Sequence, residues 1–194
     1  MKFPGFPVAR RVLMAAAVAG LVASQALMPA RADNNPKVQF NTSAGNFVVE
    51  LYPDKAPKTV ANFLQYVKDK HYDGTIFHRV INNFMIQGGG YDAKYVEKPT
   101  RAPVVHEGRE ALARGGPRNV VGTLAMARTS DPNSATAQFF INVRDNAFLD
   151  PSAQSPGYTV FGKVVSGMDV VDKIKAVPTG PGGPFPSDVP KTPV

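Results

Sequence analysis

One arginine placed among apolar residues offers the most specific chemistry in the sequence. Residues 77–89 read FHRVINNFMIQGG, and strand alternation puts Arg79 on one face of a first strand and Met85 with Gln87 on one face of a second. A short hairpin would bring these three side chains together. Because a guanidinium stays charged and presents several N–H donors, it would polarise a carbonyl bound beside the apolar residues. The competing interpretation is a surface arginine whose stem packs on the core, and spacing alone favours that one.

Three further stretches place aromatic and polar side chains together. They are QFFIN at 138–142, FLD at 148–150 and YTVFGKV at 158–164. Taken singly, each is typical of a core strand or of a loop anchored on the core, because apolar alternation first of all indicates burial. Their chemistry therefore depends on which elements bring them next to Arg79.

Hydrophobic periodicity predicts those elements. Residues 37–42 and 47–52 alternate around a four-residue turn that contains glycine, which is typical of a β-hairpin. Apolar residues between Val60 and Val67 recur at helical spacing, and a second helix is expected after Gly167. Short strands are expected at 75–80, 84–87, 122–127, 138–143 and 158–164. Many short strands with two helices favour a closed β-barrel covered at its ends, although periodicity does not exclude a sandwich.

The remaining composition sets simple bounds. The chain has 194 residues and no cysteine, so one domain is expected and disulfides or cysteine chemistry are excluded. Residues 91–118 show no clear period and are predicted to be irregular. From about Pro178 the chain is rich in proline and glycine, which indicates an extended C-terminal tail.

The first 32 residues are typical of a secretory signal peptide. The pair RR at 10–11 lies in a basic start, an uncharged apolar run covers 12–28, and ARA at 30–32 supplies a cleavage site. We expect cleavage after Ala32, which leaves 33–194 as the domain. An uncleaved membrane anchor is the alternative, and a twin-arginine export route stays open. This segment also carries four of the seven net positive charges, so the remaining +3 argues against a nucleic-acid partner.

Taken together, the motifs resemble the cyclophilin family of peptidyl-prolyl cis/trans isomerases. The FHR and FMIQGG pair is followed, in the family's order, by GTLAMA at 122–127, QFFI at 138–141, FLD at 148–150 and VFGKV at 160–164. The resemblance covers most of 37–177. It implies a mainly β fold, namely a closed eight-stranded antiparallel β-barrel capped by two α-helices, with a substrate groove on its outer surface. The N-terminal segment and the GPFPSDVP tail resemble bacterial exported members, so a periplasmic or secreted location is expected.

The resemblance also implies roles for individual residues. Arg79 is the expected catalytic residue. The residues expected to hold the proline ring are Phe84, Met85, Phe140 and Leu149. Those expected to hydrogen-bond the peptide or to line the groove are Gln87, Ala127, Arg128 (through its backbone), Gln138, Phe148 and Tyr158.

Two of these positions depart from the better-known eukaryotic pattern. Phe148 stands where tryptophan is common, and Tyr158 stands where histidine is common. Because that tryptophan is linked to tight cyclosporin binding, we expect cyclosporin to bind weakly. Isomerase activity is expected to persist, because Phe148 keeps an aromatic surface and Tyr158 can still close the pocket.

The implied reaction needs no cofactor and no metal. Rotation about an Xaa-Pro bond faces a barrier of roughly 20 kcal/mol, because resonance gives the C–N bond partial double-bond character. An enzyme has only to favour the twisted state over both planar states. Arg79 could donate to the preceding carbonyl and to the proline nitrogen, whose lone pair returns on twisting.

Other functions fit the sequence less well. A hydrolase would need a nucleophile with a base, but no G-x-S-x-G motif is present, and the three histidines have no metal-binding spacing. The serious alternative is a non-catalytic module that binds proline-containing segments as a chaperone. We expect a monomer that makes no membrane contact after signal cleavage.

Overall fold

The computed structural model describes residues 35–194, so the predicted signal peptide and its cleavage site lie outside the described residues. The chain enters the fold through β1 (Lys37–Thr42) and β2 (Gly45–Leu51), which pair in antiparallel register. The predicted hairpin is confirmed, with a tighter turn than expected, because Thr42 already pairs with Gly45. No helix in the described part of the chain is long and apolar enough to cross a membrane.

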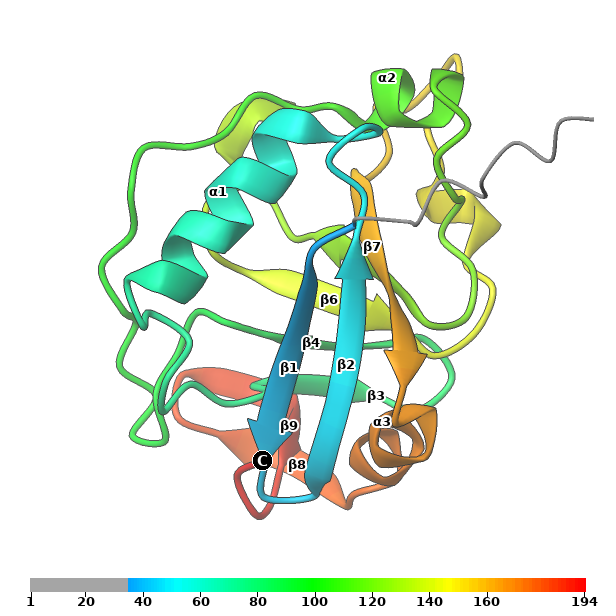
Figure 1. Ribbon diagram of the computed structural model, residues 1–194. Coiled ribbons are helices and arrows are strands. Elements are labelled where there is room, and N and C mark those ends of the chain that lie inside the picture. The colour runs from blue at the N-terminus through cyan, green and yellow to red at the C-terminus, as the bar shows by residue number, and fades with distance from the viewer. Residues whose placement is uncertain (1–34) are drawn as a thin grey trace, which may run out of the picture. The chain divides into compact units, whose positions relative to one another are not determined.

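Seven strands form one curled antiparallel sheet in the order β1-β2-β7-β5-β6-β4-β3 (Figure 1). The five further strands are β3 (Arg79–Ile81), β4 (Met85–Gly88), β5 (Thr123–Met126), β6 (Phe139–Asn142) and β7 (Val160–Ser166). The mainly β fold is therefore confirmed. The closed eight-stranded barrel is not, because β1 and β3 are the two edges of this sheet in the described residues and the last two strands pair only with each other.

Side-chain alternation gives the sheet two apolar faces with different roles. The inner face carries the main core, to which β4, β5, β6 and β7 contribute Ile86, Leu124, Ile141 and Phe161. Their immediate neighbours in sequence point to the outer face and form a second, smaller apolar cluster. These neighbours are Met85, Ala125, Phe140 and Val160, and the buried Leu149, from outside the sheet, completes the cluster. The outer cluster becomes the floor of the site described below.

Helix α1 (Pro57–Lys68) packs its predicted stripe on the inner core, where Val60 and Phe63 are fully buried. Its first turn has no capping side chain of its own. Instead the buried Glu107 carboxylate accepts hydrogen bonds from the backbone amides of Lys58 and Thr59, at 3.2 and 2.8 Å. An acid at this end of a helix satisfies free amides and interacts favourably with the helix dipole.

The rest of the chain closes the ends of the sheet. Helix α2 (Gly108–Ala113) lies within the stretch predicted to be irregular, and α3 (Met168–Lys175) is the predicted second helix. The proline- and glycine-rich segment forms a separate hairpin of β8 (Thr179–Gly182) and β9 (Phe185–Pro190), which composition did not predict. In Figure 1 this hairpin lies at the lower end of the sheet, near β3. Two short 3-10 turns, η1 (Pro132–Ser134) and η2 (Ala147–Leu149), complete the elements.

Candidate active site

A cavity of about 210 Å³ lies on the outer face of the sheet. Its floor is the outer apolar cluster, in which Met85 and Phe140 come from the neighbouring strands β4 and β6 and are almost completely buried. The Tyr158 ring meets the Phe140 ring edge to face, with centroids 5.5 Å apart. An apolar depression of this size suits a small ring such as that of proline.

Arg79 lies exposed at one edge of this cavity. It pairs directly with Gln87 across β3 and β4, so that both side chains lie on the outer face with Met85. The guanidinium carbon is 6.0 Å from the centroid of the Phe84 ring. The predicted grouping of Arg79 with Met85 and Gln87 is thus observed, and a permanent cation borders an apolar pocket.

Two glutamines form a hydrogen-bonded pair beside the arginine. The Gln87 side-chain amide donates to Gln138 Oε1 at 3.0 Å. This bond leaves the Gln87 carbonyl and the Gln138 amide group able to bind a peptide backbone. Gly90 makes the arrangement possible, because a Cβ at that position would lie 2.6 Å from Gln138 Cγ.

The opposite wall is held by a buried carboxylate. Leu149 closes η2 and faces the cavity, and the next residue, Asp150, is 6% exposed. Asp150 accepts hydrogen bonds from the backbone and side-chain amides of Asn119, at 2.8 and 3.0 Å. It also accepts one from Arg118 at 3.2 Å. This network fixes the loop that positions Leu149.

Phe148 and Arg128 border the cavity in different ways. Phe148 is 72% exposed and stacks on Phe84, with ring centroids 5.6 Å apart, outside the lining of the cavity. The Arg128 guanidinium lies 4.6 Å from the Tyr158 ring centroid and donates twice to the Gly157 carbonyl, at 3.1 and 2.8 Å. Its side chain therefore contributes to the wall, whereas the resemblance had implied its backbone.

The structure brings the residues expected at the site into one neighbourhood. Those that line the cavity are Arg79, Phe84, Met85, Gln87, Ala127, Arg128, Phe140, Leu149 and Tyr158. Gln138 joins through Gln87, and Phe148 joins through Phe84. Their individual roles stay predictions, because the geometry gives proximity and not function.

His78, next to Arg79 in the chain, is a buried neutral group. Burial, and then the charge of Arg79, lowers the pKa of His78 to about 4. Its Nδ1 atom has no hydrogen-bond partner within residues 35–194. The ring packs between Tyr91 and Phe185, with centroids 4.7 and 5.2 Å away. The arginine is therefore the charged group that the β3 strand contributes to the site at neutral pH.

A separate cavity, whose lining residues do not include Arg79, offers fewer reactive groups. It has about 350 Å³ between the β1–β2 turn and the end of the chain, where Phe40, Tyr72 and Val194 are among its lining residues. No charged side chain lines it. Within residues 35–194, no cluster of three or more His, Asp or Glu side chains could hold a metal ion.

Two supporting groups, Asp150 and Phe185, are not predicted by the sequence patterns. Asp150 appeared only as the end of a motif, and Phe185 only as part of a tail. The paired glycines at 182 and 183 were the available signal for a turn in that segment.

Comparisons with known proteins agree with this geometry. Residues 37–194 match the family described as cyclophilin type peptidyl-prolyl cis-trans isomerase/CLD. A peptidyl-prolyl cis-trans isomerase of Acinetobacter baylyi is 55% identical over 168 residues, which cover 87% of this chain and 86% of that protein. Peptidyl-prolyl cis-trans isomerase B of Escherichia coli is 55% identical over 157 residues, which cover 79% and 92%.

A solved structure shows the same fold. It is a Cryptosporidium parvum cyclophilin type peptidyl-prolyl cis-trans isomerase in the presence of the dipeptide Ala-Pro. The TM-score is 0.63 at 25% identity, and the match covers 81% of this chain and 93% of that one. The chain therefore belongs to the cyclophilin-type peptidyl-prolyl cis-trans isomerases. Its activity is the cis/trans isomerisation of Xaa-Pro peptide bonds.

Proposed function

We propose that the outer-face cavity binds the proline ring of a polypeptide and that Arg79 is the catalytic residue. The observation that carries this proposal is a permanently charged guanidinium 6.0 Å from the centroid of an apolar wall residue, Phe84, at the edge of a cavity that has room for a proline ring. Charge beside low-dielectric surface acts more strongly than charge in water.

The reaction then requires rotation and no bond cleavage. The proline ring stays in the apolar pocket while the preceding carbonyl turns. Arg79 donates to that carbonyl or to the proline nitrogen, whose lone pair is a better acceptor when the peptide bond is twisted. An interaction that is stronger in the twisted state than in either planar state accelerates the rotation, and each 1.36 kcal/mol of this difference is tenfold in rate.

Peptide binding at this cavity is tested by NMR titration with an Ala-Pro-containing peptide. The Cryptosporidium parvum relative was studied with such a dipeptide. We expect chemical shift changes centred on the outer face. In Phe140→Leu, which shortens the pocket floor without opening the inner core, peptide binding should be at least about tenfold weaker. Val165→Ala is the control, because Val165 is an exposed apolar residue on β7 outside the cavity lining. Shifts centred on another face would contradict the assignment.

We also propose that the protein acts on exported polypeptides in the periplasm or outside the cell. The support is the three-part N-terminal pattern of basic, apolar and small residues. Mass spectrometry of the exported protein should find an N-terminus at Asp33. A full-length chain retained in the membrane fraction would contradict this and would favour the uncleaved anchor.

Three further expectations about partners belong to the same proposal. The protein acts as a monomer. It acts without nucleic acid, since a net charge of only +3 remains after the N-terminal segment. Cyclosporin binds weakly, because Phe148 offers a smaller aromatic surface than tryptophan. Sedimentation analysis with and without nucleic acid tests the first two expectations, and calorimetric titration with cyclosporin tests the third.

Closure of the sheet into an eight-stranded barrel is a further proposal. The Phe77 amide donates to the Val194 carbonyl at 2.9 Å, close to the β3 edge. Hydrogen exchange tests closure at β1. The β1 amides that point away from β2 should exchange slowly if another strand pairs with them, and fast exchange of these amides would contradict closure.

A non-catalytic binding module is the remaining alternative. Such a module would need mainly the apolar pocket, whereas a charged group at its edge is expected where a twisted bond must be stabilised. The two are separated by the effect of Arg79 on turnover and on affinity.

A further inference from the structure

Another cavity, of about 420 Å³, adjoins the proline pocket at Arg79 and Gln87 and is called the second cavity from here on. The two cavities share Arg79 and Gln87, so an extended peptide in the first can reach the second. Its other lining residues include His78, Tyr91 and, from β9, Phe185 and Asp188.

A local irregularity of the β8–β9 hairpin forms one wall of this second cavity. Gly180 pairs with Val189 and Gly182 pairs with Phe185, so residues 186–188 of β9 face the single residue 181 of β8. This bulge turns the chain, and all three of its residues line the cavity. Bulges commonly redirect a side chain beside a functional site.

Asp188 is the charged member of the bulge. It is half-buried and has φ +64°, a conformation that aspartate and asparagine adopt more readily than most residues. None of the ion pairs within residues 35–194 includes Asp188. Its carboxylate accepts one hydrogen bond, from the Ser187 hydroxyl at 3.0 Å. A carboxylate in a cavity with this single partner has capacity for a cation.

The aromatic lining residues of the second cavity suit the stem of a long cationic side chain. His78, Tyr91 and Phe185 form an aromatic cluster in which the Tyr91 and Phe185 centroids are 5.0 Å apart. Aromatic faces attract cations and also pack well against methylene groups. His78 is neutral above about pH 5, because burial lowers its pKa to about 4, and therefore does not repel a cation.

Arg79 lines both cavities, and its positive charge opposes the binding of a cation in the second. Its guanidinium carbon lies 6.0 Å from the centroid of the Phe84 ring, which lines only the proline pocket. The carboxylate of Asp188 is therefore the charge that the β9 bulge offers to a ligand in the second cavity.

We propose that this second cavity is a specificity subsite for a lysine or arginine that flanks the Xaa-Pro bond, with Asp188 as the residue that recognises its charge. The proposal rests on the proposed function, since the first cavity must hold the proline. The structural alternative is that Asp188 serves only the left-handed turn of the bulge. Asp188→Asn separates the two, because asparagine keeps the backbone preference and loses the charge.

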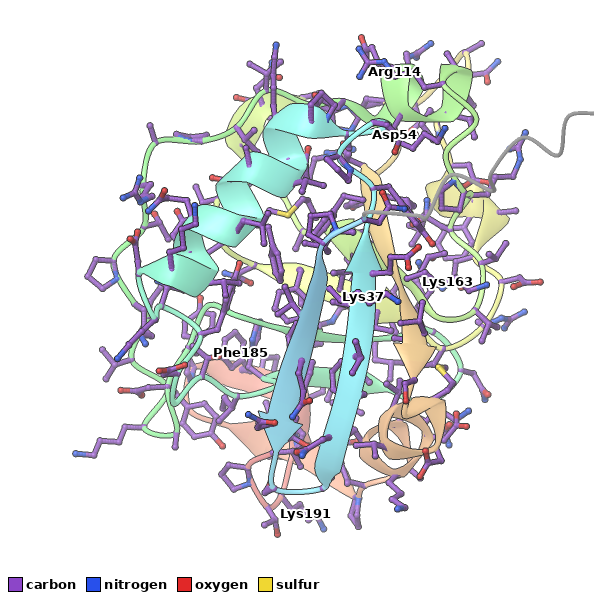
Figure 2. All side chains as sticks on the ribbon, in the orientation of Figure 1. Lys37, Asp54, Arg114, Lys163, Phe185 and Lys191 are labelled. Carbon is purple, nitrogen blue, oxygen red and sulfur yellow. The ribbon has the colours of Figure 1, made fainter. Side chains whose placement is uncertain are left out.

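The test uses the full chain and two pairs of peptides. Each pair consists of a peptide with lysine and the same peptide with N-acetyl-lysine. In the first pair this residue lies two positions before proline, and in the second pair it lies two positions after proline. Isomerisation is followed by NMR exchange at low salt for the wild type, Asp188→Asn and Asp54→Asn. Asp54 is a matched control, because it is a mainly exposed acid and lies well apart from Phe185 in Figure 2.

We expect the wild type to prefer lysine in one of the pairs by about two- to fivefold in kcat/KM, as for an exposed ion pair. The preference should fall to about one in Asp188→Asn, persist in Asp54→Asn and shrink in 1 M salt. Equal turnover of lysine and acetyl-lysine in both pairs, or a preference that survives in Asp188→Asn, would overturn the subsite. Failure to isomerise even the acetylated peptides would instead overturn the proposed function. Calorimetric affinities for the same peptides would then decide the subsite, with equal values for lysine and acetyl-lysine counting against it.

Discussion

Arg79 stands directly opposite Gln87 in the antiparallel pairing of β3 and β4, and Gln87 donates to Gln138 at 3.0 Å. The arginine is therefore set beside a pair of amides whose orientation is fixed by their own hydrogen bond. Arg79 and Gln87 come from the paired strands β3 and β4, and Gln138 immediately precedes β6, the other neighbour of β4; strands are more rigid supports than loops. A bound peptide would meet donors and acceptors that are already in place.

The glutamine pair is expected to act as a unit. Gln87→Ala and Gln138→Ala should each lower kcat/KM by about 5- to 30-fold, because each loses a peptide hydrogen bond worth about 1–2 kcal/mol and frees its partner. The double variant should lose less than the sum, with a coupling of at least ~0.5 kcal/mol. Strictly additive losses in this double-mutant cycle would show that the two amides bind independently.

The loop that carries Leu149 depends on Asp150. Asp150→Ala should lower the free energy of unfolding by about 1–3 kcal/mol, because it leaves the buried Asn119 backbone amide unpaired, while the Asn119 side chain keeps its bond to the Leu149 carbonyl. Arg118→Ala removes the other partner of this carboxylate and should cost less than ~1 kcal/mol, because the arginine side chain is 62% exposed. Urea denaturation of both variants measures the difference. Equal costs would mean that the ion pair, and not the amide network, holds the loop.

Phe148 is expected to limit cyclosporin binding. In Phe148→Trp the larger indole adds apolar surface and an N–H donor at a position that is 72% exposed and already stacked on Phe84. We expect about tenfold tighter binding by calorimetry, or ~1.4 kcal/mol, with kcat/KM for a short peptide changed less than about threefold. Unchanged cyclosporin affinity would mean that another part of the groove limits cyclosporin binding.

His78 should make stability depend on pH. Its pKa is about 4 in the folded chain against an ordinary 6.5, so between these values the unfolded chain binds more protons. The contribution of His78 is therefore complete above about pH 6.5 and is lost as the pH falls toward 4, by about 3 kcal/mol in total.

His78→Phe tests this contribution, because it keeps the ring contacts with Tyr91 and Phe185 and removes the titration. Denaturation at pH 7 and at pH 4.5 should show that the free energy of unfolding falls less in the variant than in the wild type. Some loss should remain, since burial also lowers the pKa values of His71 and His106. Identical losses in variant and wild type would contradict the assignment to His78.

The sheet itself was largely predictable, because alternation and turn residues are local signals. The strands expected at 122–127, 138–143 and 158–164 are present with boundaries shifted by one or two residues. The strand expected at 75–80 is shorter, since regular pairing with β4 begins only at Arg79. Helix α2 has six residues and was not predicted, because less than two turns give no clear helical period.

The site was predictable only in part. Alternation placed Arg79 with Met85 and Gln87, but the approach of Phe140 and Leu149 depends on strand order, which no single stretch encodes. The family resemblance, and not the strand pattern, implied that Phe140 and Leu149 belong to the pocket. It did not supply the bulge of β9 that carries Asp188, because the proline and glycine content of this segment obscures the strand pattern.

The most direct test of the account is the exchange rate of a short Xaa-Pro peptide, measured by NMR with the wild type and with Arg79→Ala, together with the peptide affinity of each. If Arg79 stabilises the twisted bond, kcat/KM should fall by about 100-fold or more, whereas the Kd should rise less than about fivefold. Equal losses of turnover and affinity would contradict the account, because Arg79 would then only bind the substrate.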